Sequence, residues 1–124
     1  KSKITGIENE KDKELNISFD KKIGDKIYKV QLIKLYYPTI SELFDNFDFT
    51  LCQTGFDGAN YYFGDFSLKD IIEKKVIVNK ITYPISSFRR IIKYSKQGFW
   101  ICPQQIEKFL NIIKTEEIIS KLFR

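Results

Sequence analysis

The chain has 124 residues, 43% hydrophobic and 30% charged, so it fits one ordinary soluble domain that buries a core without disulfides or a structural metal. It has no histidine and two cysteines, Cys52 and Cys102, which excludes a Cys/His zinc centre and Ser-His or Cys-His catalysis within the chain. A net charge of +5 favours a polyanionic partner, and we expect a cytoplasmic, intracellular protein without a membrane segment.

The two thiols are expected to be reduced and buried, as in most intracellular proteins. A disulfide between them would require only that they lie close together, and the sequence leaves that possibility open.

The amino-terminal third predicts a β-hairpin. Residues 1–14 are rich in Lys and Glu without apolar periodicity, which indicates a loosely ordered segment. Apolar and polar positions then alternate in L-N-I-S-F (residues 15–19) and again over residues 27–35. The Gly24-Asp25 turn signal between them predicts two paired strands.

The central third predicts short helices and strands. T-I-S-E at residues 39–42 matches a capping box and predicts a helix to about Asn46. D-F-T-L-C within residues 47–52 alternates and predicts a strand. A second capping box, S-L-K-D at residues 67–70, predicts a helix to about Lys75, and V-I-V at residues 76–78 predicts a brief strand.

The last third predicts helices. One runs from about Ser86 to Gln97, with Gly98 as its left-handed cap. Its inner side is expected to carry Phe88, Ile91, Ile92 and Ser95. Helical spacing resumes at Pro103 and again over residues 118–123. The fold class is therefore α+β, a small antiparallel or mixed sheet with helices, followed by a helical tail.

From about Phe47 to Ile101, the order of motifs resembles class II CCA-adding enzymes and bacterial poly(A) polymerases. The D-F-T-L strand, the D-I-I-E-K-K helix and the R-R-I-I-K-Y helix that ends in G-F follow one another as in that family. The resemblance implies a partial nucleotidyltransferase palm over residues 1–82. It also implies a helical neck over residues 83–124, packed on the palm as one compact unit.

The same resemblance implies magnesium-dependent nucleotide transfer to RNA 3′ ends, if an amino-terminal part with the family's D-x-D carboxylates completes the chain. This chain has no such D-x-D strand, and Asp12-Lys13-Glu14 is expected to be solvated surface. At residues 83–87 the family's base-reading carboxylates and arginine are absent. No catalytic or metal residue is therefore assigned, and Mg is expected only for an active full-length protein.

Five residues are candidates for binding a nucleotide or nucleic acid: Asp48, Arg89, Arg90, Lys93 and Lys96. Arg89, Lys93 and Lys96 recur at i, i+4 and i+7 and form a stripe that either grips phosphates or is a solvated helix face. Asp48 either faces a nucleotide or is a structural acid bonded to neighbouring backbone or to Arg90.

Aromatic residues give a second candidate surface, composed of Tyr61, Tyr62, Phe63 and Phe66, with Trp100 further along. They either stack bases or pack in the core or an interface. The expected partner is therefore RNA or a nucleoside triphosphate, or a protein that binds this aromatic cluster.

The alternative to an enzyme fragment is a non-catalytic remnant. It would act as a structural subunit of a larger assembly, or as a subunit that binds nucleic acid or protein, and the composition of the chain suggests a phage. A basic RNA- or DNA-binding module is the third hypothesis.

Overall fold

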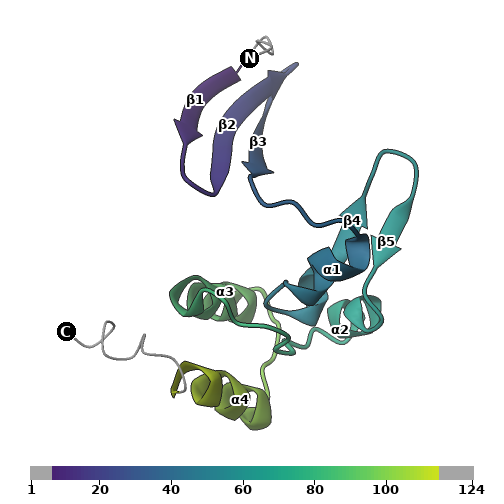
Figure 1. Ribbon diagram of the computed structural model, residues 1–124, viewed down its shortest axis with the longest axis vertical. Helices are drawn as coiled ribbons and strands as arrows, with labels where there is room; N and C mark the ends of the chain where they lie inside the picture. The colour runs from purple at the N-terminus through teal and green to yellow at the C-terminus, as the bar shows by residue number, and fades with distance from the viewer. Residues whose placement is uncertain (1–6, 115–124) are drawn as a thin grey trace, which may run out of the picture. The chain divides into compact units, whose positions relative to one another are not determined.

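The computed structural model describes residues 7–114 and confirms the α+β class (Figure 1). The chain divides into two compact units, Lys1–Tyr37 and Pro38–Arg124. This division differs from the boundary that the sequence analysis places between residues 82 and 83, which stays an expectation. No helix within residues 7–114 is long and apolar enough to cross a lipid bilayer.

The first unit is an antiparallel sheet of β1 (Ile7–Asp12), β2 (Asn16–Ile23) and β3 (Lys26–Ile33), in that order. The hairpin expected from the alternating pattern is confirmed, and Gly24 turns the chain with a φ of +60°. β1 corrects the expectation of a loosely ordered segment at residues 1–14 for its residues 7–12, whereas residues 1–6 lie outside the described residues. Its polar side chains give no apolar period, and backbone pairing with β2 makes it a strand.

Side chains alternate across this sheet. The pairs Phe19–Val30 and Ile17–Leu32 share one face, whereas Ser18–Gln31 and Asp20–Lys29 share the other.

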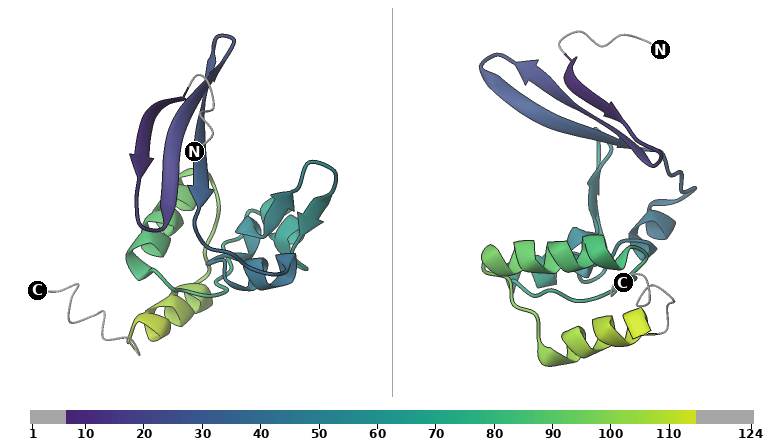
Figure 2. Two further views of the ribbon diagram at one scale, coloured as in Figure 1. Left: turned by 45° about the horizontal axis from the view of Figure 1, so that its top comes forward. Right: turned by 90° about the vertical axis from the view of Figure 1, so that its left-hand side faces the viewer.

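The second unit holds all the helices of residues 7–114, together with a two-stranded hairpin (Figure 2). Its elements are α1 (Ile40–Asp45), the 3₁₀ turn η1 (Thr50–Cys52), β4 (Thr54–Phe56), β5 (Tyr61–Phe63), α2 (Ser67–Ile72), α3 (Pro84–Lys96) and α4 (Pro103–Lys114).

The helix boundaries largely follow the predicted signals. Thr39 caps α1 by accepting a hydrogen bond from the amide of Glu42 at 3.2 Å. Gly98 follows α3 with a φ of +87° and confirms the predicted left-handed cap. The second capping box is wrong, because Phe66 holds the N-cap of α2 and the Ser67 hydroxyl donates to the carbonyl of Gly64 at 3.0 Å.

The core of the second unit consists of Phe49, Leu51, Val76, Val78, Ile81 and Phe109. The strands expected at residues 47–52 and 76–78 reduce to a single antiparallel bridge between Phe49 and Val78. The amides of Cys52 and Gln53 then bond back to Phe49 and Thr50, each at 3.1 Å, which turns the chain into η1. Alternating apolar residues therefore enter the core through a 3₁₀ turn rather than a strand.

The inner face of α3 differs from the prediction. Ser87 is buried, and Ile91 and Tyr94 pack on the core cluster. Phe88 and Ile92 are 52% and 43% exposed, although the Phe88 ring stacks on Phe109 with centroids 6.3 Å apart. The periodicity is helical as expected, but the row of side chains that faces the core is shifted by about one residue from the predicted row. The helical pattern at residues 118–123 lies outside the described residues.

Candidate protein-binding surface

Asp48 is held inside the second unit by two side-chain partners. It is 9% exposed, and its Oδ2 accepts a hydrogen bond from the Ser87 hydroxyl at 3.0 Å. Arg90 donates from one guanidinium nitrogen to Oδ1 and Oδ2 at 3.1 and 3.0 Å. The expected hydrogen bond between Asp48 and Arg90 is therefore present, and it occupies both oxygens of the carboxylate.

The basic stripe of Arg89, Lys93 and Lys96 is exposed along α3, as the spacing predicts. Lys93 Nζ lies 5.8 Å from the ring centroid of Tyr94. The structure brings Asp48 and Arg90 together and leaves the stripe at the surface. Assignment of these five residues to nucleotide or nucleic-acid binding stays a prediction.

An exposed aromatic surface covers the β4–β5 hairpin and the start of α2. It consists of Phe56, Tyr61, Phe63 and Phe66, all of which are exposed. Phe56 and Tyr61 pair across the two strands and stack with ring centroids 4.5 Å apart at 23°, while 55% and 71% of their surfaces remain exposed. The sequence predicted the cluster with Tyr62, which is only partly exposed, and missed Phe56, because G-F-D-G at residues 55–58 indicates a turn rather than the end of a short strand.

Hydrogen bonds to Asp57 organise the loop of the β4–β5 hairpin that carries this surface. Asp57 accepts hydrogen bonds from the amides of Ala59 and Asn60 at 2.8 and 2.7 Å, and from the Tyr62 hydroxyl at 2.8 Å. The two amides and the hydroxyl lower the pKa of the Asp57 carboxyl. Gly58 completes the turn with a φ of +98°.

A hollow of about 360 Å³ opens beside the aromatic surface, and we call it the α1–β5 hollow. Its lining comes from α1, η1, β5 and the loops that follow β5 and Val78: Ile40, Ser41, Phe44, Asp45, Thr50, Gln53, Tyr62, Phe63, Gly64, Asp65, Phe66 and Asn79. Phe63 and Phe66 belong to both features. The hollow could not be predicted from the sequence, because its lining residues are spread over forty positions and come together only in the folded chain.

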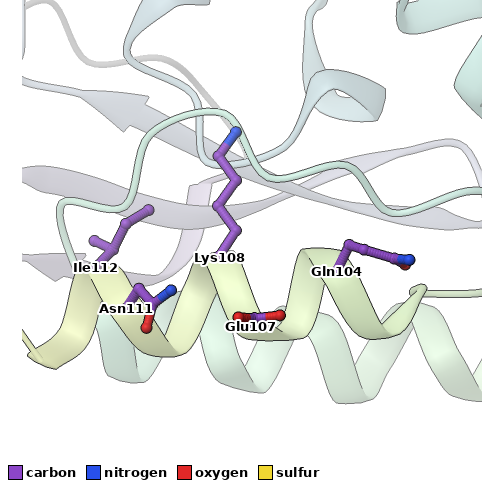
Figure 3. Close-up of a pocket in the computed structure, with 5 residues that line it drawn as sticks. All are labelled: Gln104, Glu107, Lys108, Asn111 and Ile112. Carbon is purple, nitrogen blue, oxygen red and sulfur yellow. The ribbon is translucent and has the colours of Figure 1, made fainter.

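A second hollow of about 450 Å³ lies along α4 and is lined by Gln104, Glu107, Lys108, Asn111 and Ile112 (Figure 3). Lys108 points from the helix toward the neighbouring chain segment, where its Nζ donates to the carbonyl of Val78 at 2.9 Å (Figure 3). Every lining residue comes from one helix, and the cation is already bonded to backbone. This hollow is therefore a weaker candidate than the aromatic surface.

The two cysteines are both free, and each is only partly buried, so the expectation that both thiols are buried is wrong. Cys52 Sγ lies 3.2 Å from the Tyr94 hydroxyl oxygen and shares a hydrogen bond with it. Burial raises the pKa of the Cys52 thiol and also that of the Tyr94 hydroxyl. Within residues 7–114, no group of three or more His, Cys, Asp or Glu side chains gathers in a way that could hold a metal ion.

A comparison with protein families gives one match. A model described as "Gad2: Gabija anti-defense 2 family protein" matches residues 8–74, more than half of the 124-residue chain. The matched range begins inside β1, includes the elements from β2 to α2 and the aromatic surface, and ends before α3. No curated protein and no solved structure matches the chain.

This match corrects the resemblance to class II CCA-adding enzymes and poly(A) polymerases, because the matching family is a different one. Nucleotide transfer, RNA binding and magnesium were expected from that resemblance, and the match supports none of them. The motif order that suggested it consists of short, individually weak patterns. One of them, the expected D-F-T-L strand, keeps only the bridge between Phe49 and Val78 and turns into η1 from Thr50 onward.

Proposed function

Because the chain belongs to the Gabija anti-defense 2 family, we propose that it is a phage protein that counters the Gabija defense of a bacterial host by binding a protein component of it. The proposal follows the non-catalytic alternative of the sequence analysis rather than its enzymatic reading.

The stacked and exposed pair of Phe56 and Tyr61 carries the proposal of binding. Aromatic side chains are enriched at protein interfaces because they bury a large area at a small cost in side-chain entropy. A contiguous exposed aromatic surface on a soluble protein marks an interaction site more often than chance. The family match includes this surface and leaves out the basic stripe, which favours the hairpin over α3 as the shared binding element.

The test is made in bacteria that carry the Gabija defense and express this chain. We expect the chain to restore phage growth and to co-purify with a Gabija protein as a complex stable on size-exclusion chromatography. Phe56→Ala with Tyr61→Ala should weaken that complex by more than tenfold, because large aromatic anchors dominate interface energies.

Ile72→Ala is the matched control, because Ile72 is an apolar side chain of the same unit that is 79% exposed at the last residue of α2 and is not one of the four residues of the aromatic surface. This variant should bind like the wild type. Restored phage growth without a detectable complex would overturn binding as the mechanism, and equal weakening by both variants would overturn the choice of surface.

A further inference from the structure

We propose that the α1–β5 hollow receives an arginine side chain of the bound defense protein, with the guanidinium between the carboxylates of Asp45 and Asp65 and the aromatic rings of the lining. This inference rests on the proposed function and specifies the chemistry of the partner.

The first step is the state of the polar groups in the hollow. Its two side-chain amides are engaged within the protein: Asn79 Nδ2 donates to the carbonyls of Asp45 and Phe47 at 3.0 and 2.9 Å, and Gln53 Nε2 donates to that of Phe44 at 2.9 Å. The Ser41 hydroxyl also lines the hollow and is a further polar group there. Two hydroxyl groups of the lining donate to carboxylates outside the hollow. The Thr50 hydroxyl donates to Asp70, and the Tyr62 hydroxyl donates to Asp57.

The carboxylates of Asp45 and Asp65 differ from these groups. Within residues 7–114, neither accepts a hydrogen bond nor forms an ion pair. What the hollow offers to a ligand is therefore mainly negative charge and acceptor oxygens, so the complementary group is a cation that carries several N–H donors.

The aromatic lining narrows the class of cation. Phe63, Phe66 and Tyr62 line the same hollow as the two acids. A guanidinium is planar, stacks on aromatic faces and donates to two carboxylates at once, whereas an ammonium is a compact and strongly hydrated point charge. At about 360 Å³ the hollow falls at the small end of ligand pockets, which span roughly 300–1,000 Å³, and suits one side chain rather than a large cofactor.

Continuity with the aromatic surface indicates a protein as the source of the arginine. Phe63 and Phe66 belong to both features, so a partner lying on Phe56 and Tyr61 has the hollow at its edge. An arginine beside an aromatic contact is a frequent anchor of protein interfaces.

The first experiment needs no defense protein. Amide NMR spectra of the chain are recorded while N-acetyl-L-arginine amide is added, and then with N-acetyl-L-citrulline amide, its neutral counterpart. We expect saturable shifts at Tyr62, Phe63 and Gly64 with the arginine probe, weak or absent shifts with citrulline, and loss of the effect in Asp45→Asn with Asp65→Asn. Equal responses to both probes, or none, would overturn the inference.

The second experiment measures affinity for the co-purifying Gabija protein. The Asp45→Asn, Asp65→Asn double variant should bind about 10- to 100-fold more weakly, because a desolvated guanidinium loses its charged acceptors. Glu107→Gln, the same kind of change in the α4 hollow, should stay within about twofold because a charge outside the contact contributes little. If the wild type binds and the double variant binds equally well, this inference fails while the proposed function stands. If the wild type binds no Gabija protein, the proposed function fails, and the inference about the partner fails with it whatever the arginine probe shows.

Discussion

Asp48 brings a negative charge to the edge of the core, where Ser87 and Arg90 are its side-chain partners. The Arg90 side chain is about half exposed, so solvent screens part of the attraction. We expect Arg90→Leu to lower the free energy of unfolding by about 1–3 kcal/mol, because it leaves a buried carboxylate with one hydroxyl donor. Urea unfolding measures the loss. Arg89→Leu, one position away on the exposed stripe, should change stability by less than about 0.5 kcal/mol, and equal losses would contradict a structural role for the pair.

Gly64 lies where the chain runs against Gln53. A Cβ at this position would lie 2.3 Å from Gln53 Oε1 and 2.7 Å from Gln53 Cβ, which no ordinary contact allows. We expect Gly64→Ala to cost about 1–3 kcal/mol, because the β5–α2 connection must shift and the bond from the Gln53 side chain to Phe44 is strained. Gly55→Ala is the control, since its Cβ would meet the Phe44 ring at 3.8 Å. Thermal unfolding that ranks the two variants equally would speak against this close approach.

Some residue contacts can be predicted from the sequence alone, and others cannot. The pairing of Asp48 with Arg90 is predictable, because an acid beside apolar neighbours needs a donor and the basic helix offers few. The clash at Gly64 is not, because it depends on Gln53 and on a turn that only the folded backbone defines. The acids of the α1–β5 hollow escape notice for the same reason, because Asp45 and Asp65 read as ordinary surface charges in the sequence.

The β4–β5 hairpin should respond to acid through Asp57. Its folded-state pKa lies below the ordinary value of 3.8. The loop's stabilisation is therefore present above about pH 4 and is lost as the pH falls through the lower folded value. Unfolding of the wild type, compared with Asp57→Asn between pH 6 and about pH 2, measures this term. The stability advantage of the wild type should shrink as its carboxylate takes up a proton, and parallel curves would show that the loop contributes no such linkage.

At the scale of elements, helices were more predictable than strands because their signals are local. Thr39, Gly98 and the apolar spacing of α4 lie in or beside the helices that they mark. β1 has a polar sequence and exists through its pairing with β2, which no local pattern reports. The 47–52 segment alternates like a strand, yet its only sheet-like partner is one bridge to Val78, so the chain turns at η1 instead.

At the scale of the whole molecule, the two units should differ in their ability to fold alone. Every member of the core cluster belongs to Pro38–Arg124, whereas Phe19 is the one buried hydrophobic residue within residues 7–37. A three-stranded sheet with so small a core is marginal by itself. We expect a fragment of residues 38–124 to unfold cooperatively with a midpoint close to that of the full chain, and a fragment of residues 1–37 to show no cooperative transition.

Circular dichroism during heating tests both fragments, with the full chain as the reference. Loss of cooperative unfolding in the 38–124 fragment would mean that the first unit contributes to the stability of the second. The family match spans residues 8–74 and crosses the boundary at residue 37, so a folded 38–124 fragment also separates stability from function. If it folds but no longer binds the Gabija protein, the sheet of the first unit contributes contacts of its own. If it binds fully, the second unit, which carries the aromatic surface and the α1–β5 hollow, suffices.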